Sequence, residues 1–178
     1  REEAADAVRE LKEAGITKVV MMTGDSERTA AAIAKRVGVD EYYSEVLPED
    51  KASFVEKEKE LGHKVIMIGD GINDSLALSS ASVGIAISDG AAIAREIADV
   101  TISADNLHEI VTLKRLSTAL MKRIHNNYRT IIGINGGLIA LGVTGIIMPT
   151  TSALLHNMST LTISLRSMRN LLPKEEEA

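Results

Sequence analysis

The sequence contains no cysteine, no tryptophan, one phenylalanine and three tyrosines. Without cysteine the chain forms neither disulfides nor thiolate metal sites, which agrees with a reducing compartment. With so few aromatic rings, a core must be built from Ala, Val, Ile, Leu and Met, a composition that suits α/β layers. The length of 178 residues allows one domain with a real core and a small appendage.

Full charges are missing from one long stretch, and the other charges are unevenly divided. No Asp, Glu, Lys or Arg occurs in residues 130–165. Residues 1–110 carry 12 Lys or Arg against 22 Asp or Glu, whereas residues 111–178 carry 8 against 3. The first part is therefore acidic and the second basic. Because the chain opens at Arg1 in a helical pattern, with no signal peptide, we expect it to start inside a longer protein.

Helix-like and strand-like segments alternate through the acidic part. Apolar residues at helical spacing with end signals predict helices, and short apolar runs predict strands. Such alternation indicates a parallel sheet covered by helices, with ligands beyond the carboxyl ends of the strands. Ser26 is the expected cap of the second helix. The expected strands are 18–22 (buried), 43–46, 64–68, 83–87 and 100–102, and the expected helices are 3–14, 26–38, 48–62, a helix through 78, and 91–97.

The uncharged stretch has room for two membrane-spanning helices, because one span needs about 20 residues. Pro149 is the expected turn between a first span, Ile131–Met148, and a second span from Ser152 to about Leu165. Basic residues flank both ends, which favours a cytoplasmic location for both. An amphipathic helix on a surface is the alternative for the polar second segment. The expected parts are an α/β domain (1–110), an amphipathic linking helix (111–130), two transmembrane helices (131–172) and an acidic cytoplasmic tail (173–178).

Acidic groups and small turns at predicted strand ends, and one lysine just inside the helix that follows Pro48, converge on one rim of the predicted sheet. Asp70 and Asp74 lie four residues apart across a glycine-containing turn and offer the oxygen ligands that Mg²⁺ prefers. Thr23 offers a hydroxyl and Gly24 an unhindered N–H to phosphate oxygens. Lys51 supplies a positive charge that offsets the charge on a transferring phosphoryl group. The expected ligand is therefore a phosphate held together with a divalent cation.

Each of these residues also has an ordinary structural role. An Asp after a strand often caps a helix, Thr-Gly-Asp is a common turn, and a single Lys in a helix is usually solvated. Their combination and their position at strand ends indicate the phosphate site.

Three segments resemble the later motifs of haloacid-dehalogenase-like phosphotransferases, in the form found in heavy-metal-transporting P-type ATPases. They are Met22–Asp25 (Met-Thr-Gly-Asp), Leu47–Lys51 (Leu-Pro-Glu-Asp-Lys) and Gly69–Leu78 (Gly-Asp-Gly-Ile-Asn-Asp-Ser-Leu-Ala-Leu). The resemblance covers nearly the whole chain and implies a Rossmann-type half domain followed by the last two membrane helices. It implies ATP-driven transport of a divalent transition metal through an aspartyl-phosphate intermediate, with Mg²⁺ and ATP as cofactors.

The same resemblance implies a role for each site residue. Two positions would bind the aspartyl phosphate, one would neutralise it, and three would hold or support the metal. Thr23 and Gly24 would bind the aspartyl phosphate, and Lys51 would neutralise it. Asp70 would be the Mg²⁺ ligand, with Asn73 and Asp74 supporting the metal and phosphate. Asp25 would lie towards the nucleotide.

One departure from the family bears on activity. The phosphorylated aspartate of the family lies in Asp-Lys-Thr-Gly-Thr, and the closest string here is Asp50-Lys51-Ala52, which belongs to the lysine motif. The nucleotide-binding insertion, the actuator domain and the earlier membrane helices also have no counterpart. We therefore expect the chain alone to be inactive and to depend on the missing N-terminal part of the same pump.

Polar side chains within the uncharged stretch are candidates for the transported-ion site. The two helices and short end after the phosphorylation domain resemble the heavy-metal branch of the family. Polar groups at membrane depth either line an ion path or join helices by hydrogen bonds, and both remain open here. Imidazole and amide oxygens suit Zn²⁺, Co²⁺, Ni²⁺ or Mn²⁺, and the sequence does not fix the metal. The candidates are Asn135, His156, Asn157 and Ser159.

Two other functions fit parts of the sequence. A soluble phosphatase of the same superfamily would need an upstream nucleophile and would have to keep residues 130–165 in water. A non-catalytic membrane module that senses Mg²⁺ or nucleotide fits the missing nucleophile but leaves the phosphate-handling residues unexplained. The pump interpretation places the chain in a bacterial or archaeal plasma membrane as a multi-pass protein, with its phosphorylation domain in the cytoplasm and no nucleic acid as partner.

Overall fold

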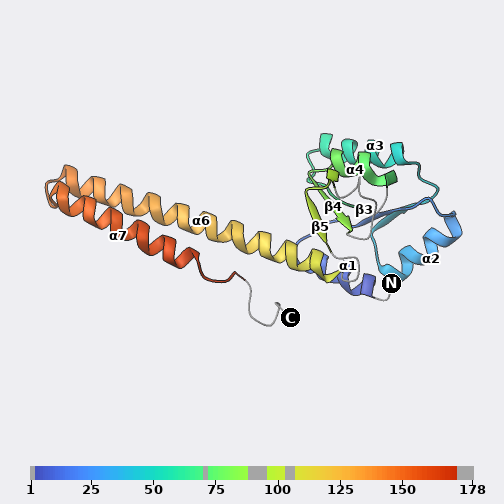
Figure 1. Ribbon diagram of the computed structural model, residues 1–178, viewed down its shortest axis with the longest axis horizontal. Coiled ribbons are helices and arrows are strands. Elements are labelled where there is room, and N and C mark those ends of the chain that lie inside the picture. Colours follow the sequence, from blue (N-terminus) through green and yellow to red (C-terminus); the bar gives the residue numbers. More distant parts are fainter. Residues whose placement is uncertain (1–2, 70–71, 88–95, 103–106, 172–178) are drawn as a thin grey trace. The chain divides into compact units, whose positions relative to one another are not determined.

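The structure is a computed structural model that describes residues 3–69, 72–87, 96–102 and 107–171. The chain divides into two compact units, Arg1–Val111 and Thr112–Ala178 (Figure 1). The elements in chain order are α1 (Glu3–Glu13), β1 (Val20–Met22), α2 (Glu27–Val37), β2 (Glu41–Tyr43), α3 (Pro48–Glu60), β3 (Ile66–Gly69), the 3-10 turn η1 (Ile72–Asp74), α4 (Ser75–Ser80), β4 (Val83–Ile87), β5 (Val100–Ile102), α6 (His108–Val143) and α7 (Pro149–Ser167).

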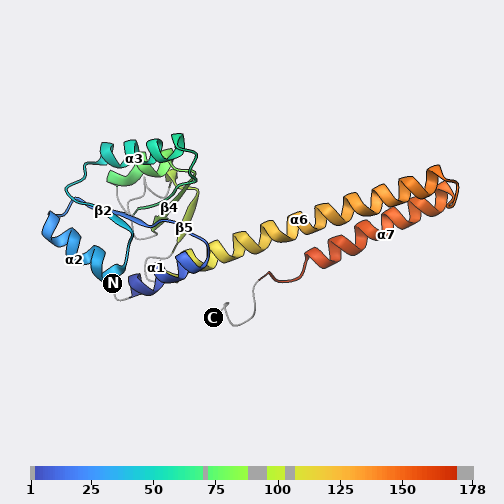
Figure 2. The same ribbon diagram turned by 180° about the vertical axis from the view of Figure 1, so that it is seen from behind.

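The first unit is an α/β domain whose described strands all pair in parallel. β1 pairs with β2, and β3, β4 and β5 form a second sheet in that order. Helices α3 and α4 lie side by side, as Figures 1 and 2 show from opposite directions. Because every pair is parallel, the carboxyl ends of neighbouring strands share an edge, and the predicted α/β class is confirmed.

Small side chains build the core of the first unit. Ala30 and Ala34 on one face of α2 are buried, and Leu78 of α4 packs on Ala86 of β4. A Cβ added to Gly84 would lie 2.6 Å from the carbonyl oxygen of Leu78. Strand β4 therefore approaches the end of α4 closely because position 84 has no side chain.

Several predicted elements need correction. Strand β2 ends at Tyr43, earlier than predicted, because β1 ends at its partner Met22. Strand β1 begins at Val20 and is only half-buried. Ser26 occupies the cap position of α2, but its hydroxyl contacts the Thr29 hydroxyl at 3.2 Å rather than a backbone N–H. Most of the predicted helix 91–97 lies outside the described residues.

The second unit is a hairpin of two antiparallel helices (Figure 2). Helix α6 ends at Val143 rather than Met148, because Gly145 adopts a φ of 72° and the chain turns. Pro149 is the first residue of α7 and not the turn itself. In the part of the chain that the structure describes, no helix combines the length and apolar character needed to cross a membrane.

Candidate phosphate and magnesium site

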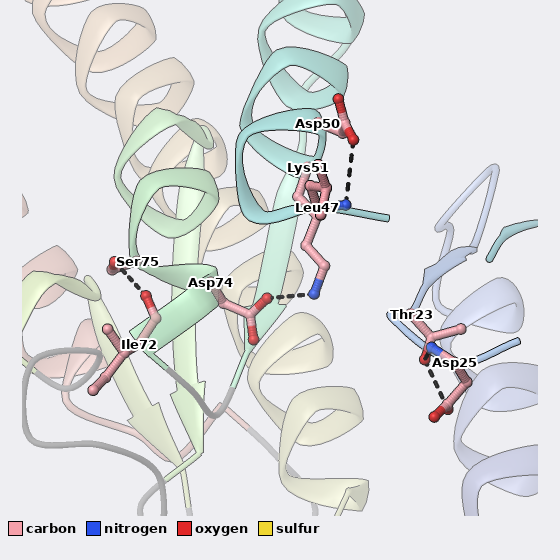
Figure 3. A network of polar contacts seen from close by, with 8 residues as sticks. All are labelled: Thr23, Asp25, Leu47, Asp50, Lys51, Ile72, Asp74 and Ser75. Atoms are coloured by element: carbon pink, nitrogen blue, oxygen red, sulfur yellow. Dashed lines mark hydrogen bonds and ion pairs between the residues drawn. The ribbon is translucent and has the colours of Figure 1, made fainter. Parts of the chain in front are cut away.

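Lys51 and Asp74 form an ion pair at the carboxyl end of β3. The Lys51 Nζ lies 2.8 Å from the Asp74 Oδ1, and Figure 3 shows the lysine reaching from the start of α3 to the aspartate. The side chains are only 14% and 11% exposed, so water screens this pair less than a surface pair. A positive charge is thus held in place where the resemblance implies a phosphoryl group.

Local hydrogen bonds position both partners. Pro48 opens α3, and the backbone N–H of Leu47 donates to the Asp50 carboxylate at 3.2 Å, which fixes the first turn that carries Lys51. On the other side, the Ser75 hydroxyl donates to the carbonyl of Ile72 at 2.6 Å, closing the turn that contains Asp74. Local hydrogen bonds therefore position both residues of a contact that joins positions 23 residues apart in the sequence.

Gly69 makes room for the Asp74 side chain. A Cβ at position 69 would lie 2.5 Å from the Asp74 Cβ and 2.9 Å from its Oδ2. No such contact is tolerated between carbon atoms, so any larger residue would displace the carboxylate. No role was predicted for Gly69, although its position at the end of an apolar run, directly before Asp70, was a usable signal.

Thr23 and Asp25 form a second polar group at the end of β1. The Thr23 hydroxyl donates to the Asp25 carboxylate at 2.8 Å, and the Asp25 N–H donates back to that hydroxyl at 3.1 Å (Figure 3). Nothing lies within 4 Å of a Cβ built on the exposed Gly24. The turn thus presents open space beside a hydroxyl and a backbone N–H.

One described donor, the Asp74 carboxylate, has the chemistry that Mg²⁺ takes. Asp70, the expected ligand, lies outside the described residues. Asp74 supplies the hard carboxylate oxygens that Mg²⁺ takes, and Asn73 is exposed beside it. Within the described ranges, no three His, Asp or Glu side chains converge to hold a metal ion.

In the second unit, two of the four candidate ion-site residues come together. The His156 Nδ1 lies 2.9 Å from the Asn135 Oδ1, joining α7 to α6. When Nδ1 donates this bond, Nε2 keeps its lone pair and can bind a metal. The Ser159 hydroxyl instead donates to the backbone carbonyl of His156 at 2.8 Å, and Asn157 is exposed.

A further polar contact in the hairpin was not predicted. The Arg123 guanidinium donates to the carbonyl oxygens of Ser167 at 2.9 Å and Asn170 at 3.0 Å, and also to that of Arg169. The Asn127 amide donates to the Ser167 hydroxyl at 2.6 Å. Arg123 was interpreted only as a basic flank, yet it satisfies carbonyls that the end of a helix leaves unpaired.

Comparisons with known proteins place these features in a family context. The model of the haloacid dehalogenase-like hydrolases matches residues 1–82. A zinc-exporting P-type ATPase of Mycobacterium marinum is 37% identical over 95% of this chain, and a manganese-exporting P-type ATPase of Mycobacterium bovis is 38% identical over the same share. A copper-exporting P-type ATPase of Staphylococcus aureus is 36% identical over the whole chain.

Solved structures agree with the sequence relatives. A zinc-transporting PIB-type ATPase matches 97% of the chain at 34% identity with a TM-score of 0.89, and this chain covers 28% of it. A phosphatase of Moraxella catarrhalis shares the fold of 63% of the chain, at 23% identity and a TM-score of 0.54. The chain spans only 23–24% of the length of the curated zinc and manganese relatives.

Proposed function

We propose that this chain, which matches heavy-metal-transporting P-type ATPases over 95% of its length, is one part of such a pump. The resemblance inferred from the motifs is confirmed by these matches. The proposed activity is ATP-driven transport of a divalent transition metal through an aspartyl-phosphate intermediate. The observation that carries it is the sheltered pair of Lys51 and Asp74 at a strand end.

Each described site residue has a proposed task in handling the phosphoryl group. Lys51, held by Asp74, offsets the negative charge of the phosphoryl oxygens. The Gly24 N–H donates to those oxygens. The Thr23 hydroxyl, which gives its single proton to the Asp25 carboxylate in this structure, turns that proton to the phosphoryl oxygens when they bind, while the Asp25 N–H holds the hydroxyl oxygen in place. A Mg²⁺ ion held by Asp70 and Asp74 would neutralise further charge on the phosphate when bound.

The nucleophilic aspartate is proposed to come from the N-terminal part of the pump. Among the described strands, β1 pairs only with β2, and β3 pairs at one edge only, with β4. Each therefore offers an edge to another strand. A parallel strand added at such an edge would bring its carboxyl end to the rim that carries Thr23 and Asp74. This arrangement would explain why the phosphate-handling residues are present without a nucleophile.

The helical hairpin is proposed to lie in the membrane, packed against the other helices of the pump. Its exposed apolar side chains, such as Ile139 (67% exposed) and Leu154 (62%), support this placement because they need an apolar covering. The ion path is proposed to pass Asn135, His156, Asn157 and Ser159. The relatives are named as zinc, manganese and copper exporters. The proposed cargo of this pump is a divalent transition-metal ion.

The test compares the isolated chain with the whole pump recovered by sequencing upstream of Arg1. The upstream sequence should encode Asp-Lys-Thr-Gly-Thr, and the whole pump should form a hydroxylamine-sensitive phosphoenzyme from ATP. The isolated chain should form none. Hydrolysis of a phosphomonoester by the isolated chain would instead support the phosphatase. A gene that starts next to Arg1, whose product alters the activity of an intact pump, would support the regulatory module.

In the whole pump, His156→Ala should reduce metal-stimulated ATP hydrolysis, while Thr160→Ala, one turn further along α7, should not. If both substitutions changed metal-stimulated ATP hydrolysis equally, His156 would have no specific role in the ion path. The comparison is matched because both side chains lie on α7 and both are exposed.

A further inference from the structure

A cavity of about 640 Å³ opens at the carboxyl ends of β1 and β2, beside the Thr23–Asp25 turn. Its walls come from the end of β1, the start of α2, strand β2 with the loop after it, and the first half of α3. The described lining residues are Met22, Glu27, Tyr42, Tyr43, Ser44, Glu45, Val46, Asp50 and Phe54. None of the tasks proposed above uses this cavity.

The lining combines rings with carboxylates. Three of the four aromatic residues in the entire sequence line it, together with three acidic residues, and none of the nine is Lys or Arg. Tyr43 and Phe54 pack against one another with ring centroids 5.2 Å apart and planes tilted by 57°. In a chain so poor in aromatic residues, this concentration indicates a pocket suited to a cation that also contacts rings.

Glu27 is held as a fixed carboxylate in this pocket. It accepts hydrogen bonds from the Tyr42 hydroxyl at 2.8 Å and the Ser44 hydroxyl at 2.5 Å. The bond from Ser44, followed by that from Tyr42, lowers the pKa of Glu27. The carboxylate is therefore ionised at neutral pH and oriented by its neighbours.

The lining chemistry indicates the class of cation. The lining carboxylates lie beside two tyrosines and a phenylalanine, a combination that suits an organic cation able to contact both. Phosphates and nucleotides are disfavoured because they would add negative charge to this lining. A guanidinium fits best, since it binds carboxylates through a planar fork and stacks on aromatic rings.

We propose that this pocket receives an arginine side chain from the N-terminal part of the same pump. The source rests on the proposed function and on the chain covering only 23% of its zinc-exporting relative. The loop lining the pocket is bonded to the candidate phosphate site: the Glu45 N–H donates to the Asp25 carbonyl at 2.9 Å, and the Val46 N–H to the Thr23 carbonyl at 3.0 Å. Docking of the arginine stiffens the turn that carries Thr23.

The ligand chemistry is tested on the full 178-residue chain without ATP. The sequence lacks tryptophan and has a single tyrosine besides Tyr42 and Tyr43, so in a Tyr128→Phe background tyrosine fluorescence reports on the pocket alone. Titration with N-acetylarginine amide should give a saturable change. The isosteric, neutral N-acetylcitrulline amide should give none. Glu27→Gln should weaken arginine binding by roughly fivefold or more.

Glu60→Gln is the matched control, because Glu60 is an exposed carboxylate on α3 outside the lining; its binding should equal that of the parent. An equal response to citrulline, no saturable response, or no effect of Glu27→Gln would overturn the proposal. Because no pump activity enters this assay, its failure is distinct from a failure of the proposed function.

The source of the arginine is tested in the whole pump. Phe54 is replaced by the photo-reactive p-benzoylphenylalanine, which keeps a ring in the pocket, and crosslinked peptides are identified by mass spectrometry. We expect a peptide with an arginine from the N-terminal part of the same polypeptide. Crosslinks only to another protein, or none above those of the same residue placed at position 60, would overturn this source.

Discussion

The two units hold their polar side chains in different ways. In the first unit a core of small residues shelters the Lys51–Asp74 pair, which is at most 14% exposed. In the second unit none of the described residues, 112–171, is buried. Its helices are joined there by contacts such as Asn135 with His156 and Arg123 with the end of α7. The first unit can thus preorganise a site by itself, whereas the second relies on whatever surrounds it.

This difference predicts that similar substitutions have unequal effects in the two units. A polar partner removed in the first unit leaves a sheltered group unsatisfied. A polar partner removed in the second unit leaves a group that water can reach.

Lys51→Met should cause the largest loss. In the whole pump, turnover of the phosphoenzyme should fall roughly 100- to 1000-fold, because the charge that offsets the phosphoryl group is removed. In the isolated chain, the free energy of unfolding should drop by about 1–3 kcal/mol, because the Asp74 carboxylate loses its partner. The measurements are phosphoenzyme decay and denaturant unfolding. Lys57→Met, on an exposed position of the same helix, is the control, and equal losses in both variants would contradict the role of Lys51.

Replacing one glycine by alanine in each unit compares how tightly the two units pack. Gly69→Ala should destabilise the first unit by about 1–3 kcal/mol, because its Cβ would lie 2.5 Å from the Asp74 Cβ. Gly136→Ala on α6 meets nothing within 4 Å, and should stabilise the helix by up to about 1 kcal/mol. Thermal unfolding of each variant shows whether the substitution raises or lowers the stability. A destabilising Gly136→Ala would show that the hairpin packs more tightly than its exposed surface indicates.

Arg123→Gln should have a smaller and local effect. The variant loses the guanidinium bonds to the carbonyls of Ser167, Arg169 and Asn170. Because the site is only partly buried, we expect the last turn of α7 to open more easily by about 1 kcal/mol. Amide hydrogen exchange of residues 163–167 measures it, with Lys122→Gln as the control. Unchanged protection would mean that water replaces the arginine without cost.

The elements that the sequence predicted well have boundaries set locally. Strands 83–87 and 100–102 match the structure because apolar runs end at clear signals, and α2 ends at Gly38 because its φ of 79° favours glycine. The second strand was predicted at 43–46, whereas β2 covers Glu41–Tyr43. Its position is set by pairing with β1, a partner distant in the sequence. The apolar composition continues past Val143, so the end of α6 could not be read from hydropathy.

The site was predictable as a set of residues but not as a set of contacts. The motifs placed Thr23 and Asp74 after predicted strands and Lys51 at the start of a predicted helix. The contact of Lys51 with Asp74 depends on how α3 packs beside α4, and the need for glycine at position 69 depends on where the Asp74 side chain lies. Such facts arise from packing between segments distant in the sequence. The aromatic and acidic pocket was missed for the same reason.

The smallest expected effect is a pH dependence confined to the first unit. The hydrogen bond from Lys12, followed by that from the Val19 N–H, lowers the pKa of Asp40. Since the pKa is lower in the folded state, the contribution of Asp40 is present above about pH 4, the ordinary pKa of Asp, and is lost as the pH falls through the lowered value. Asp40→Asn should therefore flatten this part of the stability profile.

The second unit should not follow this acid transition, because residues 111–174 contain no Asp or Glu. The tyrosines separate the two responses: Tyr42 and Tyr43 report on the first unit, and Tyr128 reports on α6 in the second. Acid titration of Tyr128→Phe and of the double variant Tyr42→Phe/Tyr43→Phe should show a transition below about pH 4 only when the first-unit tyrosines remain. Asp6→Asn, an exposed partner of Arg9, is the control for Asp40→Asn. A shared acid midpoint for both sets of tyrosines would show that the units unfold together.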